Sequence, residues 1–262
     1  MSPLKENTIK LVRDFRIKSS NENGQNFLVD DSILAEEIRQ AGLRESDVVL
    51  DIGAGFGSIE SEARKKCKVI AIEKEIKCYS YLLDKYEIDQ NVQLINADAL
   101  DMIYPKFNKV VSNPPYSITD RILDKLLFYD FEIGIMIIPN TMAAQLLSEE
   151  NSTRFSAVQK IFFGFSEIMK VGKEAFYPQP RITSRMVKIV RRPNDIRQQI
   201  FRRREMTLKN AVISGLNELH GATKKEGKKT FSDLPNKIKA LGGKQVKRLS
   251  LDEIDSLARF GW

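Results

Sequence analysis

The chain has 262 residues, of which 42% are hydrophobic and 29% are charged, a composition typical of a globular protein with room for one α/β domain and a smaller second one. No apolar stretch approaches the roughly 18 to 20 residues of a membrane span, and the amino terminus lacks the hydrophobic middle of a signal peptide, so we expect a cytoplasmic protein. The net charge of +7 is unevenly distributed, because residues 191–262 hold 17 Lys and Arg against 8 Asp and Glu, a net +9 that leaves −2 for the rest.

The first 24 residues are predicted to form an N-terminal extension that is polar and loop-like through Asn23. It leads into the sequence GQNFLVD at 24–30. A helix follows, capped by Asp31 or Ser32 and ended by Gly42. The apolar face of this helix carries Ile33, Leu34 and Ile38.

From Asp47 onward, short apolar runs alternate with helix-like or loop segments. The runs are VVLDI at 48–52, KVIAIE at 68–73, QLINAD at 93–98, KVVSN at 109–113 and IGIMII at 133–138. Such runs suit strands that are buried on both faces, so the alternation predicts a mostly parallel sheet covered by helices on both sides. A buried helix competes for 133–138, but Gly134 and Pro139 favour a strand.

The last β-like run, at 182–190, is followed by Pro193 and Asn194, which mark a domain boundary. We therefore predict a first domain over 1–192 and a second over 193–262. The second is predicted to be all-helical, with helices at 196–219, 234–241 and 251–260 and a charged linker at 222–229. A basic helical tail on a near-neutral body suggests a polyanionic partner, because Lys and Arg release condensed counterions when they neutralise phosphates. A solvated charged face is the alternative.

The strongest local motif is DIGAGFG at 51–57, which directly follows a predicted strand and precedes a helix. Glycines at 53, 55 and 57 allow a sharp turn and a close approach to a ligand. Glu73 lies 20 residues beyond Gly53, the spacing at which a carboxylate reaches the hydroxyls of a ribose. The pattern GxGxG differs from the dinucleotide pattern GxGxxG. It therefore points to a ligand without a pyrophosphate, and S-adenosylmethionine fits.

A carboxylate follows the third predicted strand, in the sequence NADALD. Asp98 is placed to accept a hydrogen bond from the adenine amino group of such a cofactor, whereas Asp101 is expected to point away. Taken alone, an Asp at a strand end is more often a turn former or a helix cap. The neighbouring motifs favour the binding role.

The motif with the most chemical content is Asn113-Pro114-Pro115-Tyr116, at the carboxyl end of the fourth strand, where ligands bind in open α/β sheets. An adenine amino nitrogen is a poor nucleophile because its lone pair is delocalised into the ring. The side-chain oxygen of Asn113 and the carbonyl of Pro114 can accept its two hydrogens and draw the nitrogen toward tetrahedral geometry. Tyr116 offers a face on which an unpaired base can stack. The structural alternative is a tight turn.

A second aromatic residue is predicted at the same site. Phe176, in the segment AFYPQPRITS, is expected to form a second stacking wall, with the prolines of that segment fixing its loop. A hydrophobic staple is the alternative. No general base is expected, because a sulfonium methyl group is already activated and positioning supplies most of the acceleration.

Three residues belong to types that often bind metals, but their positions do not indicate a metal site. Cys67 and Cys78 fit neither a zinc spacing nor a disulfide framework, so we predict that both pack in the core. His220 is the single histidine and lies far from every motif, so we place it at the surface. We therefore expect no metal site.

Together these motifs resemble the ribosomal RNA adenine N6-dimethyltransferases of the KsgA type, over nearly the whole chain. The matching segments are GQNFLVD, DIGAGFG, IEKE, NADALD, SNPPYSI, FYPQPRITS and RREMTLKNAV. The resemblance implies a Rossmann-like class I methyltransferase domain followed by a helical RNA-docking domain. It implies cofactor contacts by Asn26, Leu28, Gly53, Gly55, Glu73, Asp98 and Asn113. It implies that Asn113 and Tyr116 also hold the target base, and with Pro114 and Phe176, which the motifs themselves suggest, they make up the predicted catalytic group.

The resemblance also implies an activity and its partners. The expected reaction is the N6-dimethylation of two adjacent adenosines near the 3′ end of small-subunit ribosomal RNA, with S-adenosylmethionine as methyl donor and a role in subunit maturation. The expected partner is that RNA or a pre-30S-type ribosomal particle. We expect the enzyme to be a cytoplasmic monomer that uses neither a metal nor a membrane.

Two departures from the family pattern keep other substrates open. Pro114 stands where the family usually has Leu or Ile, a form also seen in DNA adenine methyltransferases, and the segment between Lys18 and Gly24 is longer than usual. The alternatives are a large-subunit ribosomal RNA adenine methyltransferase of the macrolide-resistance type, a DNA adenine methyltransferase, and a largely non-catalytic ribosome-assembly factor with a vestigial pocket.

Overall fold

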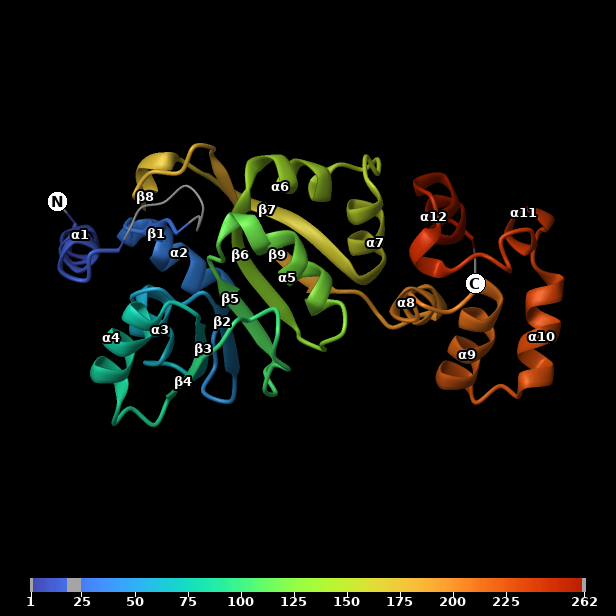
Figure 1. Cartoon of the computed structure of the whole chain (residues 1–262), viewed down its shortest axis with the longest axis horizontal. Coiled ribbons are helices and arrows are strands. Elements are labelled where there is room, and N and C mark those ends of the chain that lie inside the picture. Colours follow the sequence, from blue (N-terminus) through green and yellow to red (C-terminus); the bar gives the residue numbers. More distant parts are fainter. Residues whose placement is uncertain (1, 18–24, 261–262) are drawn as a thin grey trace. The chain divides into compact units, whose positions relative to one another are not determined.

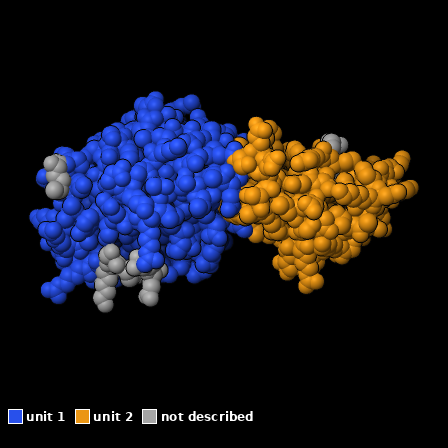
Figure 2. All heavy atoms as spheres, turned by 90° about the horizontal axis from the view of Figure 1, so that it is seen from above, with its two compact units in different colours: residues 1–147, 165–191 blue, residues 148–164, 192–262 orange. Residues whose placement is uncertain are grey.

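The computed structural model describes residues 2–17 and 25–260, and the chain divides into two compact units (Figures 1 and 2). The first unit comprises residues 1–147 and 165–191, and the second comprises residues 148–164 and 192–262. Pro193, the predicted boundary, thus lies beside the third point at which the chain passes between units, after residue 191. Residues 148–164, which were predicted to belong to the first domain, group with the second unit.

The amino-terminal segment begins with a helix, α1 (Pro3–Asp14), so the prediction of a loop is wrong for these residues. Ser2 caps the helix by accepting a hydrogen bond from the backbone N–H of Lys5 at 3.3 Å. A proline in the first turn suits such a start, because its φ is already helical. The buried side of the helix carries Thr8, Leu11 and Val12. The predicted loop over 18–24 falls outside the described residues.

A seven-stranded sheet forms the centre of the first unit, in the order β4-β3-β2-β5-β6-β9-β7 (Figure 1). The strands are β2 (Val48–Ile52), β3 (Lys68–Glu73), β4 (Val92–Asn96), β5 (Lys109–Ser112), β6 (Ile133–Pro139), β7 (Phe163–Val171) and β9 (Ser184–Arg191). Neighbouring strands from β4 to β6 are parallel, and β9 joins β6 in antiparallel fashion. This arrangement confirms the predicted mostly parallel sheet, including a strand rather than a helix at 133–138. Strand β7 was not predicted.

The sheet is buried on both faces, as the apolar runs predict. Val49, Val69 and Val111 share a core cluster with Ile38 of the helix that follows the GQNFLVD segment. The alternate residues of the same strands, Leu50, Ile70 and Val110, are equally inaccessible. The helices of this unit after α1 are α2 (Asp31–Ala41), α3 (Ser58–Ala63), α4 (Ile76–Tyr86), α5 (Thr119–Leu126) and α6 (Asn140–Leu147).

Helix α2 ends where the sequence predicts but is capped one residue earlier. The carboxylate of Asp30, rather than Asp31 or Ser32, accepts hydrogen bonds from the backbone N–H groups of Ser32 at 2.9 Å and Ile33 at 3.1 Å. Gly42 closes the helix with φ 54°, a left-handed conformation that suits glycine.

The order of the strands locates a crevice. The chain passes from β2 outward through β3 to β4, and then returns to β5 on the other side of β2. In open sheets, ligands bind at the carboxyl ends of the strands where this reversal occurs. A separate antiparallel pair, β1 (Phe27–Leu28) and β8 (Phe176–Tyr177), ties the GQNFLVD segment to the segment that carries Phe176.

The second unit is all-helical. Its elements are α7 (Arg154–Phe162), α8 (Ile196–Arg202), α9 (Leu208–His220), α10 (Lys224–Asp233), α11 (Asn236–Lys239), the 3₁₀ turn η3 (Val246–Arg248) and α12 (Leu251–Ala258). The single helix predicted at 196–219 is broken between α8 and α9. The break pairs with a distant segment, because Leu208 donates its N–H to the carbonyl of Lys244 at 2.8 Å and Val246 donates to Met206 at 3.0 Å.

The linker predicted at 222–229 is wrong, since most of it lies in α10. Thr223 starts this helix with a capping box to Glu226. Gly227 and Phe231, one turn apart, form its buried side, and a Cβ on Gly227 would lie 3.1 Å from Cγ2 of Ile213 on α9. Four lysines are exposed on the rest of the helix: Lys224, Lys225, Lys228 and Lys229. They are called the α10 lysines below.

Candidate active site

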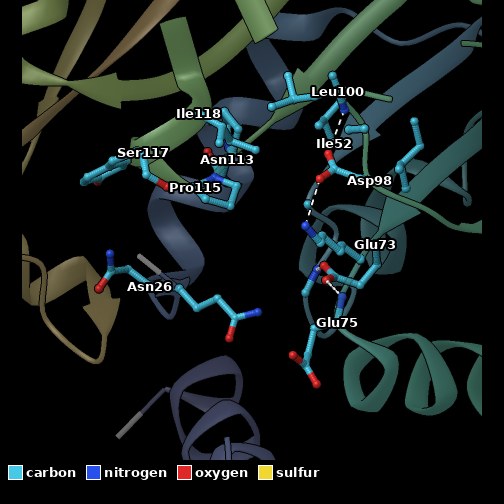
Figure 3. A pocket seen from close by; sticks show the side chains of 18 of the residues that line it. Asn26, Ile52, Glu73, Glu75, Asp98, Leu100, Asn113, Pro115, Ser117 and Ile118 are labelled. Atoms are coloured by element: carbon cyan, nitrogen blue, oxygen red, sulfur yellow. Dashed lines mark hydrogen bonds and ion pairs between the residues drawn. The ribbon is translucent and has the colours of Figure 1, made fainter. Parts of the chain in front are cut away.

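A cavity of about 430 Å³ opens at the carboxyl ends of β2, β3, β4 and β5. Every predicted site residue except Leu28 lines it, namely Asn26, Gly53, Gly55, Glu73, Asp98, Asn113, Pro114, Tyr116 and Phe176. Figure 3 shows Asn113 and Pro115 on one side of the cavity and Glu73 and Asp98 on the opposite side. The fold thus brings together motifs that are up to 150 residues apart in the chain.

The glycine turn forms the floor near the end of β2. Gly53 has φ 82° and Gly55 has φ 57°, both in the left-handed region. A Cβ on Gly53 would lie 3.0 Å from Cδ of Pro115, and one on Gly55 would lie 2.9 Å from Cδ1 of Phe27. Both positions therefore require glycine for conformation and for space.

Glu73 ends β3, and its carboxylate is fixed by the backbone. Oε2 accepts the N–H of Gly55 at 2.8 Å, and Oε1 accepts the N–H of Glu75 at 2.7 Å. Burial raises the pKa of this carboxyl, and the backbone N–H donors partly oppose that rise. Each oxygen has a second lone pair, so the group can still accept two further hydrogen bonds from a vicinal diol.

Asp98 follows β4, and two donors orient it. Its Oδ1 accepts the N–H of Leu100 at 2.9 Å, and its Oδ2 accepts Nζ of Lys74 at 2.8 Å (Figure 3). The ammonium of Lys74, followed by the N–H of Leu100, holds the pKa of Asp98 below its ordinary value. Asp98 is therefore an ionised acceptor at the cavity wall, and Asp101 is exposed outside the lining, as expected.

Asn113 follows β5, and only the nitrogen end of its side-chain amide has a hydrogen-bond partner among the described residues. Its Nδ2 donates to Oε2 of Glu37 on α2 at 3.0 Å. Its Oδ1 is buried, and no described residue donates a hydrogen bond to it. Glu37 is fully buried, and burial raises its pKa to about 8 although the bond from Asn113 opposes this.

The prolines after Asn113 form a fixed turn. The carbonyl of Pro115 accepts the N–H of Ile118 and Oγ1 of Thr119, both at 3.1 Å, so it serves the turn itself. Pro114 also lies within the cavity lining, and its carbonyl is the main-chain acceptor that the sequence motif predicts for a ligand.

The two aromatic residues meet at a corner of the cavity. The rings of Tyr116 and Phe176 are 6.3 Å apart between centroids and 80° apart in plane, which is an edge-to-face contact. The hydroxyl of Tyr116 forms a short hydrogen bond with Oγ of Ser184 on β9. The rings are thus fixed, but they are perpendicular to each other rather than two parallel walls around a gap.

Leu28 lies apart from the other predicted residues. It is buried in the core cluster and lines an adjoining cavity of about 370 Å³ between α1, the glycine turn and α3. Asn26, Gly53, Gly55 and Asn113 line both cavities. The two cavities therefore share the glycine turn as a common wall. A ligand in the first cavity would have to extend beyond this turn, into the second cavity, to contact Leu28.

Three residues that shape the site were not predicted: Glu37, Lys74 and Ser184. The sequence held a signal for Glu37, because it lies on the same helical face as Ile33, Leu34, Ile38 and Ala41, and an acid on an apolar face needs a buried partner. Lys74 adjoins the motif residue Glu73 and gave only proximity as a signal. Ser184 gave none, because its contact with Tyr116 spans 68 residues.

The residues with metal-binding or thiol chemistry lie elsewhere. Cys67 and Cys78 are buried, which confirms them as packing residues, and burial raises the pKa of the Cys67 thiol to about 11. His220 is exposed at the end of α9, as predicted. Among the described residues, no group of three or more His, Cys, Asp or Glu is arranged to hold a metal ion. None of the helices in those residues is long and apolar enough to cross a membrane.

Comparison with known proteins matches residues 16–260 to the family model described as ribosomal RNA adenine dimethylase. The probable ribosomal RNA small subunit methyltransferase A of Thermococcus sibiricus is 30% identical over 262 residues, which cover 95% of this chain and 94% of that protein. Its counterpart from Methanosarcina barkeri is 36% identical over 219 residues, covering 78% and 76%.

Two solved structures share the fold. A dimethyladenosine transferase from Plasmodium falciparum has a TM-score of 0.62 at 24% identity and covers 88% of this chain and 95% of its own. The 23S rRNA methyltransferase ErmE has a TM-score of 0.62 at 21% identity, covering 89% and 98%. The matches in sequence span nearly all of the chain, and this chain therefore belongs to the ribosomal RNA adenine dimethylase family.

Proposed function

We propose that this enzyme transfers methyl groups from S-adenosylmethionine to the N6 nitrogens of two adjacent adenosines near the 3′ end of small-subunit ribosomal RNA. The family supplies the reaction, and the names of the relatives from Thermococcus sibiricus and Methanosarcina barkeri support the choice of subunit. The observation that carries the proposal is the Asn113 amide: Asn113 and Pro114 both line the cavity, and the buried Oδ1 of Asn113 receives no hydrogen bond from any described residue.

The cavity fits the cofactor by its own chemistry. The turn at Gly53 and Gly55 lines the cavity with bare backbone, where a Cβ would collide with Pro115 or Phe27. The carboxylate of Glu73 is fixed as an acceptor for two ribose hydroxyls, and Asp98 is an ionised acceptor for an adenine amino group. When bound, S-adenosylmethionine supplies an electrophilic methyl group on a positively charged sulfur. We therefore assign Glu73 to the ribose and Asp98 to the adenine. The glycine turn, together with Asn26 and Leu28, is assigned to the methionine end.

The catalytic work of the protein is to hold the amino group of the target adenine. Asn113 Oδ1 accepts one amino hydrogen and the carbonyl of Pro114 accepts the other, so that the nitrogen lone pair is directed away from the ring. The methylated nitrogen then carries a positive charge and loses its proton to water. Before the second methyl transfer the N6 nitrogen carries only one hydrogen. Only one of the two acceptors can therefore bind it in that round.

Tyr116 and Phe176 hold the base in this orientation. The perpendicular rings allow a base to stack on the face of Tyr116 while the edge of the base meets Phe176. Ser184 fixes the tilt of Tyr116 through its hydroxyl. Stacking on one aromatic face contributes about 1 to 3 kcal/mol for each base.

The basic helical unit is proposed to dock the RNA. Its net charge of +9 over residues 191–262 includes the α10 lysines, which are exposed outside the buried side made by Gly227 and Phe231. Clustered lysines bind phosphates without reading sequence, which suits a docking role. We further propose that the enzyme acts as a cytoplasmic monomer on RNA within an assembling pre-30S-type particle.

The substrate is tested by incubating the protein with methyl-labelled S-adenosylmethionine and three nucleic acids in parallel: small-subunit ribosomal RNA, large-subunit ribosomal RNA and duplex DNA. Digestion of the RNA to nucleosides and mass spectrometry then report one or two methyl groups per adenosine. We expect dimethyladenosine in the small-subunit RNA alone. Label confined to large-subunit RNA or to DNA would replace the proposed substrate, and no label in any arm would support the non-catalytic assembly factor.

A further inference from the structure

One buried acid touches the proposed amino-binding group. Glu37 lies on α2 with 0% of its surface exposed, on the same side as Ile33, Leu34 and Ile38. Its Oε2 accepts Nδ2 of Asn113 at 3.0 Å, although 76 residues separate the two in sequence. Its Oε1 has no hydrogen-bond partner among the described residues. A carboxyl group in such surroundings destabilises the fold, so an apolar residue would pack better there.

The contact decides which way the Asn113 amide faces. A carboxamide has a donor end and an acceptor end of nearly the same shape, so only its hydrogen-bond partners fix its orientation. A carboxylate only accepts, so Glu37 holds the NH2 end toward α2. The acceptor end, Oδ1, is then turned away from Glu37, and no described residue donates a hydrogen bond to it. The reversed amide would set Oδ1 against the oxygens of Glu37 and would offer N–H to the amino group of the base.

We propose that Glu37 is a positioning residue, which selects the orientation of Asn113 in which Oδ1 accepts a hydrogen from the target adenine. The inference rests on the proposed function, because it assigns Asn113 the same task. Glu37 itself does not line the cavity. It therefore acts through Asn113 and not by contact with substrate or cofactor.

Two carboxyl groups and one hydrogen-bond donor act on the charge of Glu37. Glu60 of α3 and Asp51 of β2 are buried carboxyls, and repulsion between their negative charges and that of Glu37 disfavours its ionised form. Asn113 is the hydrogen-bond donor that favours its ionised form. A protonated Glu37 keeps one acceptor oxygen for Nδ2, but it can also donate its own proton to Oδ1, as the NH2 of a glutamine can. The ionised carboxylate, which the bond from Asn113 favours, is therefore the form that excludes the reversed amide.

The test compares Glu37→Leu, Glu37→Gln and, as a matched control on the same helix, Glu36→Leu. Glu36 is half-buried and pairs with Arg39 and Gln40 rather than with Asn113. Each variant is assayed for single-turnover methyl transfer to small-subunit RNA, for cofactor and RNA affinity, and for thermal unfolding. We expect Glu37→Leu to lower the rate about 100-fold, the scale of a misplaced catalytic group, while both affinities stay within about twofold.

Glutamine separates positioning from packing. Its side-chain oxygen can accept Nδ2 of Asn113, but its NH2 can also pair with Oδ1, so both orientations become available. We therefore expect Glu37→Gln to lose less than about tenfold in rate. Hydrogen exchange of the Asn113 side-chain amide, followed by NMR, gives a readout without substrate, and we expect faster exchange in Glu37→Leu than in Glu36→Leu.

The outcomes distinguish the two claims. An unchanged rate in Glu37→Leu, with an active wild type and an inactive Asn113→Ala, overturns the positioning role alone. An equal loss in all three variants, or a loss that follows unfolding temperature or cofactor affinity, also overturns it. An active Asn113→Ala, or a wild type inactive on every RNA, overturns the proposed function instead. If Glu37→Leu fails to fold, Glu37→Met takes its place, with the same expected rates.

Discussion

Replacing Glu37 with glutamine is expected to remove a loss of stability that the wild-type protein suffers as the pH rises. The carboxyl titrates near its ordinary value of 4.5 in the unfolded chain, whereas burial raises its pKa to about 8 in the folded protein. Between these values the unfolded state releases a proton that the folded state keeps. The contribution of Glu37 to stability is therefore fully present below pH 4.5 and is lost as the pH rises through 8.

The size of the effect follows from the two pKa values. The interval from 4.5 to about 8 corresponds to about 5 kcal/mol of differential free energy. Glu60 and Asp51 are also buried and also have raised pKa values, and like-charge repulsion links both of them to Glu37. The difference in unfolding free energy between Glu37→Gln and wild type therefore reports the Glu37 carboxyl together with the relief of this repulsion.

The assay is urea unfolding at several pH values from 5 to 8.5. We expect Glu37→Gln and wild type to differ least at pH 5 and the variant to gain steadily, up to about 5 kcal/mol relative to wild type by pH 8.5. Glu36→Gln serves as the control, because the pKa of Glu36 is lowered to about 2 by Arg39 and its removal cannot produce this trend. A difference in unfolding free energy between Glu37→Gln and wild type that does not change with pH would show that burial does not raise the pKa of Glu37.

Three further predictions concern ligands. Gly55→Ala is expected to weaken cofactor binding at least tenfold in calorimetry, since its φ is 57° and its Cβ would lie 2.9 Å from Phe27; unchanged affinity would remove the turn from the cofactor site. Tyr116→Ala is expected to weaken RNA substrate binding or turnover by about 1 to 3 kcal/mol, and Tyr116→Phe by less, because phenylalanine keeps the stacking face and loses only the bond to Ser184; equal losses would make the hydroxyl the important group. Changing the α10 lysines together to alanine is expected to weaken RNA binding and to reduce the slope of log affinity against log salt by about 0.7 to 0.9 for each phosphate that the variant no longer neutralises, whereas an unchanged slope would place docking elsewhere.

The parallel strands were predictable from sequence for a physical reason. Strands buried on both faces must be apolar throughout, so β2, β3, β5 and β6 appear as continuous apolar runs with bounds close to those observed. β7 escaped prediction because its residues are mostly half-exposed and do not alternate regularly. α10 escaped because only Gly227 and Phe231 face the core, which leaves a lysine-rich sequence that resembles a linker.

The site divides in the same way. Motifs set by local backbone, such as the glycine turn and the segment from Asn113 to Tyr116, were visible because each needs particular residues in a row. Contacts between distant side chains were not. The bond from Asn113 to Glu37 and the contact between Tyr116 and Ser184 depend on which helix and strand lie beside them, and the sequence gives no register for those neighbours.

In the proposed reaction, the Asn113 amide holds the amino group that is methylated. The most direct measurement is the single-turnover rate of methyl transfer to small-subunit RNA by Asn113→Ala, with cofactor and RNA both saturating and both affinities measured separately. We predict a rate about 100- to 1,000-fold below wild type, the usual effect of removing one acceptor or donor at a reacting group, with RNA affinity retained. A variant that methylates adenosine as fast as wild type would contradict this claim.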